Sequence, residues 1–161
     1  MRFHAALSTA AASVLVLFAG TGTSHAASDS REAIPSITAD ATTKASAVVV
    51  GCLFESMKPF YVTAGGPLYA QGKIKSCTTP KPDACKLDVT LEKKLSNGLY
   101  GVVANKNTGW KTCKAKTLSV PYKCPQRIQK HTHKTVSSLQ IEYKGKYGTK
   151  VVGSSTIATN C

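Results

Sequence analysis

The segment Cys85-Lys-Leu-Asp-Val-Thr-Leu-Glu92 alternates apolar and polar side chains along its whole length. The cysteine and the three aliphatic residues share one phase, and the charged and hydroxyl side chains share the other. Strict period-two alternation is typical of a strand that is buried on one face and solvated on the other, as in antiparallel sheets. This segment therefore predicts an antiparallel β protein.

Weaker alternation extends this interpretation to residues 48–54, 68–74 and 139–143, and to a last strand in which Val151, Ile157 and Cys161 share a phase. Turn-forming glycine, asparagine and proline separate these segments, as in Ser96-Asn97-Gly98. No convincing helical period intervenes. We expect residues 46–161 to form a single domain, an immunoglobulin-like antiparallel β-sandwich of about seven strands.

The first residues have the pattern of a secretory signal peptide. A positive head at Met1-Arg2 is followed by an apolar run over residues 10–19 and by the small-x-small sequence Ser24-His25-Ala26. The run is shorter than the ~20 residues that a membrane-spanning helix needs. We expect cleavage after Ala26, a flexible arm over residues 27–45, and release of a monomer outside the cell.

The even number of cysteines predicts three disulfides in an exported chain, and the absence of a CxxC pair disfavours zinc. Spacing and phase favour Cys113–Cys124, Cys77–Cys85 and Cys52–Cys161. A second scheme keeps Cys113–Cys124 and joins Cys52 to Cys77 and Cys85 to Cys161.

Several motifs in order resemble the small secreted, cysteine-containing β-sandwich proteins of actinobacteria. They are Gly72-Lys-Ile-Lys-Ser-Cys77, the strand from Cys85 to Lys94, Gly109-Trp110, Cys113-Lys-Ala115 and Tyr122-Lys-Cys124. The resemblance covers roughly residues 47–140 and implies a disulfide-stapled β-sandwich. It implies no activity, because most proteins of that loose group have none assigned. The Tyr-Arg-Thr-x-Val strand usual in that group is approximated here only by Lys134-Thr135-Val136.

The positive charge is concentrated in one half of the chain. Residues 27–92 contain seven basic and seven acidic residues, whereas residues 93–161 contain thirteen basic residues and one acid, a net charge of +12. Solubility alone could explain such an excess, but we favour an anionic partner: an envelope polymer, an acidic polysaccharide, anionic lipid or nucleic acid. Because lysine predominates, we expect diffuse, salt-sensitive binding. The predicted binding residues are Lys111, Lys114, Lys116, Lys123, Arg127, Lys130, Lys134, Lys144, Lys146, Tyr147 and Lys150.

Aromatic residues are interleaved with these lysines and could add contact area. Tyr147 lies in a Lys-Gly-Lys-Tyr-Gly turn and is predicted to be exposed, whereas Trp110 and Tyr143 are predicted to be core residues.

The sequence gives little support for catalysis, and we expect no enzyme activity, no cofactor and no metal. Two alternatives remain open beside the cationic binding protein, for which an antimicrobial or effector role is conceivable. One is a protease inhibitor that presents a disulfide-tied, proline-containing loop from Thr78 to Ala84. The other is a small hydrolase or nuclease that uses His131 or His133 with Glu142, since a ribonuclease needs a His–Glu pair in a basic cleft.

Overall fold

The computed structural model describes residues 30–39, 48–125 and 128–161 of the chain. The predicted signal peptide, its cleavage site at Ala26 and the predicted binding residue Arg127 lie outside these residues. All regular structure within them is β-strand. None of the described residues belongs to a helix that could cross a membrane.

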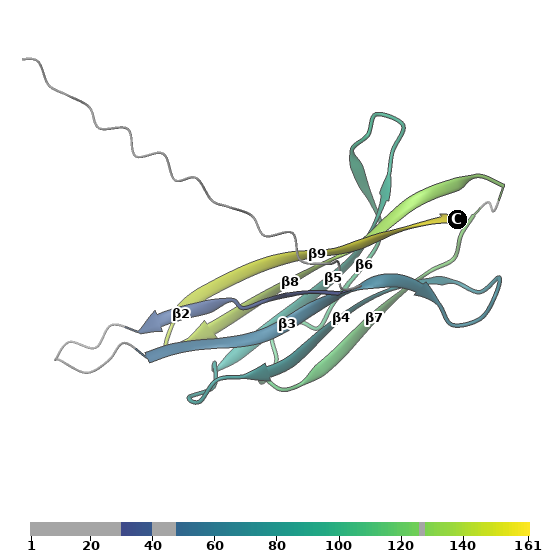
Figure 1. The fold of residues 1–161 in the computed structure, drawn as a ribbon. Coiled ribbons are helices and arrows are strands. Elements are labelled where there is room, and N and C mark those ends of the chain that lie inside the picture. The colour runs from purple at the N-terminus through teal and green to yellow at the C-terminus, as the bar shows by residue number, and fades with distance from the viewer. Residues whose placement is uncertain (1–29, 40–47, 126–127) are drawn as a thin grey trace, which may run out of the picture.

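The described residues contain nine strands, which form two antiparallel sheets (Figure 1). The five-stranded sheet contains β1 (Ser30–Ala33), β2 (Ser36–Ala39), β3 (Val48–Tyr61), β4 (Leu68–Cys77) and β7 (Lys116–Tyr122). The four-stranded sheet has the order β6 (Tyr100–Asn107), β5 (Ala84–Lys94), β8 (Lys130–Tyr143) and β9 (Lys146–Asn160). The all-β antiparallel prediction is confirmed, although the structure has nine strands instead of about seven.

The two sheets face each other across one apolar core. Residues Cys85, Leu87, Val89 and Leu91 of β5 are all buried, as their alternation predicts. They belong to the same cluster as buried residues of the five-stranded sheet, such as Phe54. Polar contacts also cross the core.

The sheets approach each other closely where polar side chains meet. Ser56 on β3 donates a hydrogen bond to the Thr135 carbonyl (3.1 Å), and Ser137 donates to Ser56 (3.1 Å). A Cβ atom at Gly72 of β4 would lie 2.6 Å from Ser137 Oγ and 2.7 Å from Val89 Cγ2. Glycine is therefore required by the spacing between the sheets at this point.

Residues 30–39, predicted as part of a flexible arm, form β1 and β2, so that part of the prediction is wrong. Both strands pair with β3, β1 along its middle and β2 along its first residues. Ile37 is buried in the core, and Lys75 of β4 forms ion pairs with Glu32 of β1 and Glu55 of β3. These contacts cover an edge of β3 that would otherwise present unpaired backbone groups.

Three disulfides are present, but neither predicted pairing scheme is correct. The bonds are Cys52–Cys77, Cys85–Cys113 and Cys124–Cys161, and no cysteine is free. The predicted Cys113–Cys124 bond, common to both schemes, is absent, because β7 lies between these cysteines and carries them toward opposite ends of the sheets. The second scheme had only Cys52–Cys77 right, a bond between directly opposed residues of β3 and β4.

Candidate aromatic and cationic binding surface

Two exposed aromatic rings from distant parts of the chain meet on the surface. Trp110 and Tyr147 have ring centroids 5.9 Å apart at an interplanar angle of 69°, an edge-to-face contact. Tyr147 is 69% exposed, which confirms the prediction for this residue, and Trp110 is 43% exposed. The prediction that Trp110 is a core residue is wrong. Tyr143, the other predicted core aromatic, packs against the core and is partly buried.

Backbone pairing holds Trp110 at the edge of the four-stranded sheet. The next residue, Lys111, exchanges two backbone hydrogen bonds with Cys85 (2.8 and 2.9 Å), and Cys85 is bonded to Cys113. This short antiparallel bridge lies on the same edge of β5 as β6 and adds one backbone pair to the sheet. Trp110 is therefore fixed on both sides, although it lies outside a regular strand.

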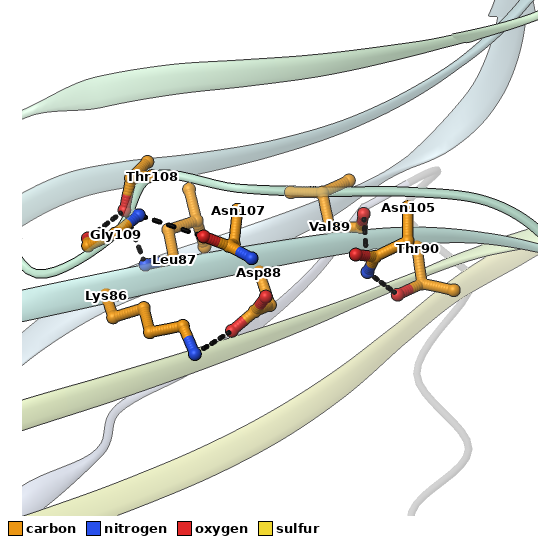
Figure 2. Close-up of polar contacts among 9 residues, drawn as sticks. All are labelled: Lys86, Leu87, Asp88, Val89, Thr90, Asn105, Asn107, Thr108 and Gly109. Atoms are coloured by element: carbon orange, nitrogen blue, oxygen red, sulfur yellow. Dashed lines mark hydrogen bonds and ion pairs between the residues drawn. The ribbon is translucent and has the colours of Figure 1, made fainter.

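The turn before Trp110 is fixed by side-chain hydrogen bonds (Figure 2). The Gly109 amide donates to Asn107 Oδ1 (3.0 Å), and the Leu87 amide donates to Thr108 Oγ1 (3.0 Å). Gly109 has a φ of 64°, in the left-handed region that glycine adopts readily. A defined turn thus presents Trp110 to solvent at the start of β5.

Tyr147 is held by the hairpin that joins β8 to β9. It lies opposite Glu142, which in turn lies opposite Ala84, so Tyr147 and Ala84 lie on the same face of the sheet. The Lys144 amide donates to Asp83 Oδ2 (2.7 Å), which ties the hairpin to the residue before β5. Both aromatic rings therefore depend on the first residues of β5 for their position.

Exposed lysines neighbour these aromatic residues in the chain, although pairing with Cys85 and Tyr143 turns Lys111 and Lys146 toward the other face of the sheet. Lys111 follows Trp110 directly, Lys146 precedes Tyr147, and all three lysines of the set, Lys111, Lys144 and Lys146, are exposed. Lys144 Nζ lies 5.4 Å from the Tyr143 ring centroid, within the range of a cation–π contact. We call this set, Trp110, Lys111, Lys144, Lys146 and Tyr147, the Trp110 surface.

Polar side chains on the outer face of β5 and β6 form further contacts (Figure 2). Lys86 Nζ lies 3.7 Å from Asp88 Oδ2, and Asn105 donates through Nδ2 to Thr90 Oγ1 (2.8 Å). These side chains point outward from β5 and β6, and they could donate to and accept from hydroxyl-rich ligands.

No family model, curated protein or solved structure matches this chain. The candidate site is therefore argued from its own residues.

The predicted binding residues do not form one cluster. Lys123 follows β7 and Lys130 begins β8, at the end of the sheets that holds the Cys124–Cys161 bond. The β8–β9 hairpin lies at the other end of β8, ~40 Å away at the usual strand rise. Three further predicted lysines are exposed but do not belong to the Trp110 surface: Lys114, Lys116 and Lys150.

Lys134, also a predicted binding residue, is already engaged by protein groups. Its Nζ atom lies 3.2 Å from Glu92 Oε2 and 4.0 Å from the Tyr100 ring centroid. An added anion would have to compete with Glu92 for this lysine.

The predicted histidine and glutamate pair is not assembled. His131 and His133 have ring centroids 6.5 Å apart, but Glu142 lies nine residues from His133 along β8, on the opposite face of the strand and ~30 Å away. His133 is fully buried, and neither ring nitrogen has a hydrogen-bond partner. Burial lowers the pKa of His133, and the positive charge of Lys93 acts in the same direction.

The cysteines do not constitute a metal site. Among the described residues, the Sγ atoms of Cys52, Cys85 and Cys113 lie within 4.8 Å of one another. All three belong to disulfides, so none offers the thiolate that binds a metal.

The loop from Thr78 to Ala84 is attached at both ends, although not by the predicted Cys77–Cys85 bond. Thr78 exchanges hydrogen bonds with Gly51, and the Asp83 amide donates to the Glu142 carbonyl (2.8 Å). Lys81 is exposed, whereas Pro82 next to it is buried.

Proposed function

We propose that this protein is an exported, non-enzymatic binding protein that engages an anionic polysaccharide through the Trp110 surface. One observation carries the proposal: Trp110 and Tyr147 are far apart in sequence, solvent-exposed and in contact, and each has a lysine next to it in the chain. An exposed tryptophan costs hydration free energy in a monomer and is enriched where proteins bind partners.

The geometry favours a sugar polymer over a nucleic acid. Because the two rings meet edge to face, they form a corner and not a row of parallel rings on which successive bases could stack. The lysines supply point charges instead of the bidentate fork with which arginine recognises phosphate and guanine. Uronate or sulfate groups on a polysaccharide can be neutralised by such point charges without a bidentate contact.

The strand pairing also limits which lysines of the basic half could contact the polymer. Lys111, Lys144 and Lys146 lie at one end of the four-stranded sheet, and the hydroxyl and amide groups of β5 and β6 lie on the outer face that carries Tyr147. A polymer that contacts the aromatic corner can therefore continue along a polar face.

The fold is consistent with a protein that functions outside a reducing compartment. Three disulfides in a chain of this size are typical of exported proteins. We propose that residues 1–26 direct export, that the two sheets form an immunoglobulin-like sandwich, and that the resemblance to secreted actinobacterial β-sandwich proteins reflects this architecture. Coating an acidic envelope polymer would suit an antimicrobial or effector role.

The single tryptophan of the chain is a built-in reporter of the site. We expect polygalacturonate and dextran sulfate to change the Trp110 fluorescence in a saturable titration at low salt, and neutral dextran to have no effect. Tyr147→Ala combined with Lys144→Gln and Lys146→Gln should weaken binding at least tenfold. The matched control is Lys123→Gln with Lys130→Gln, which removes charge at the other end of β8; equal weakening by both sets would contradict the proposal.

The two alternatives have less support from the observed contacts. The inhibitor interpretation depended on a loop closed by Cys77–Cys85, and these cysteines bond elsewhere. The hydrolase or nuclease interpretation depended on a His–Glu pair, and the two residue types lie far apart on β8.

A further inference from the structure

The β5–β6 hairpin projects from the body of the molecule and has a fixed tip. Figure 1 shows it standing clear of both sheets at the end where the chain terminates. The Leu95 amide donates to the Leu99 carbonyl (2.7 Å), and the Gly98 amide donates to the Leu95 carbonyl (3.0 Å). Gly98 has a φ of 83°, and the Leu99 amide donates to Asn97 Oδ1 (3.0 Å). The tip is therefore a formed turn whose side chains have defined positions.

This tip exposes large apolar side chains to solvent. Leu95 and Leu99 lie opposite each other on either side of the turn and are 45% and 66% exposed, and Val102 on β6 is 64% exposed. Turns are normally occupied by polar residues, as Ser96 and Asn97 are here. Among the described residues, neither leucine belongs to the core cluster, although Leu95 lies over Gly101, so their exposed surfaces are available to a partner.

Two lysines precede the leucine-containing turn at the end of β5. Lys93 and Lys94 end β5, and Lys94 lies opposite Tyr100. The acidic residue of the same strand end, Glu92, is neutralised by Lys134 at 3.2 Å. The hairpin thus combines an apolar tip with a positive base.

We propose that the β5–β6 hairpin docks on an anionic lipid bilayer, with Leu95 and Leu99 inserted among the acyl chains and Lys93 and Lys94 at the headgroups. Interfacial binding strengthens with the apolar area inserted and with attraction between basic residues and anionic lipid. A second copy of the chain fits less well, because apposed tips would bring like charges together.

This site is separate from the Trp110 surface. Tyr147 lies across β8 from Ala84, the first residue of β5, whereas the hairpin follows Lys94, the last. At the usual strand rise, ~33 Å separates the two ends of β5. The lipid proposal therefore goes beyond polysaccharide binding and can fail independently of it.

Vesicle co-sedimentation tests the proposal. We expect wild-type protein to bind vesicles of equal parts phosphatidylglycerol and phosphatidylcholine and to bind pure phosphatidylcholine at least tenfold more weakly. Leu95→Ser with Leu99→Ser should lower the partition coefficient on anionic vesicles at least tenfold. Val151→Ser removes an equally exposed apolar side chain from β9 and should bind as wild type. Trp110→Ala should also bind as wild type, which separates this site from the polysaccharide site.

A second measurement reports insertion directly. In a Trp110→Phe background, Leu99→Trp places the only tryptophan at the tip, and its emission should shift to the blue on anionic vesicles. Circular dichroism and thermal unfolding verify that each variant folds. An unshifted emission, or a leucine variant that sediments like wild type, would overturn the proposal. So would a concentration-dependent dimer that the leucine change abolishes while vesicles remain unbound, since the tip would then serve a second copy.

Discussion

The Sγ atoms of Cys52 and Cys85 lie 3.9 Å apart, although each cysteine is bonded to a different partner. Cys52 is on β3 and Cys85 is on β5, so this contact brings two disulfides together in the core where the two sheets meet. One bond joins neighbouring strands of a sheet, and the other ties the Lys111 segment to β5. Together they fasten the end of the molecule that carries the Trp110 surface.

We expect removal of the Cys85–Cys113 bond to destabilise the protein by about 3–4 kcal/mol, because it closes a loop with a sequence separation of 28 residues. The variant is Cys85→Ser with Cys113→Ser, measured by urea unfolding at equilibrium. The Cys124→Ser and Cys161→Ser pair, which opens a loop of similar length, is the control for a general effect of lost cross-links. Loss of this second bond should lower the free energy of unfolding by a similar amount but leave Trp110 fluorescence unchanged.

Non-reducing peptide maps should show the three observed bonds. A Cys113–Cys124 peptide would contradict them.

The sequence was sufficient to predict β3, β4, β5, β8 and β9 but not the cysteine pairing. Alternation in residues 85–91 depends only on which face is buried, and every apolar position there is indeed in the core. Disulfide partners depend on which strands are neighbours, which periodicity does not encode. With three cysteine sulfurs within 4.8 Å of one another, small changes in strand path would change the pairing.

The phase predicted for the last strand fails for a physical reason. A register shift opposite Lys134 and Val136 displaces β9 by one residue, so Val151 is 58% exposed and does not share a face with Ile157. A β-bulge of this kind breaks a period-two pattern without a signal in the apolar residues.

The candidate site was predicted only in part. Tyr147 and the lysines beside it were predicted as exposed binding residues because they occupy a glycine-containing turn. Trp110 was missed, although the turn at Asn107-Thr108-Gly109 and the lysine after it indicated exposure. Its contact with Tyr147 depends on the pairing of β5, β8 and β9, which a local pattern does not reveal.

Gly72→Ala should lower the free energy of unfolding by roughly 1–3 kcal/mol, the usual cost of overpacking a core. The added methyl group would meet Ser137 and Val89 at 2.6 and 2.7 Å and force the sheets apart. Gly153→Ala on β9 is the control, because its nearest atom lies 4.0 Å away. Denaturant midpoints compare the two variants, and similar midpoints would show that the sheets are not in close contact at Gly72.

Stability should decrease as the pH falls from 7.5 to 5 because of His133. Burial lowers the pKa of this histidine in the folded protein, so the unfolded chain, with a histidine pKa near 6.5, binds more protons over this range. The stabilisation is complete above pH ~6.5 and is lost progressively below it.

His133→Leu should abolish most of this pH dependence, whereas His131→Gln should retain it. Thermal unfolding from pH 7.5 to 5 measures both variants. If His133→Leu followed the wild-type curve, the buried imidazole would not be its source.

The salt dependence of polysaccharide binding should locate the cations that bind the polymer. Each lysine that neutralises an anionic group releases a counterion, so log K falls linearly with log salt concentration. Charge reversal at Lys111, Lys144 and Lys146 should reduce that slope and weaken binding to polygalacturonate by about 1–3 kcal/mol in total, a few tenths to one for each exposed lysine. The matched triple at the other end of the sheets, Lys94→Glu, Lys123→Glu and Lys130→Glu, lowers the net charge equally and should leave the slope nearly unchanged. Titrations from 20 to 300 mM salt, about the range over which screening changes most, compare the two proteins. Equal slopes would mean that net charge alone attracts the polymer and that the Trp110 surface has no special part in binding.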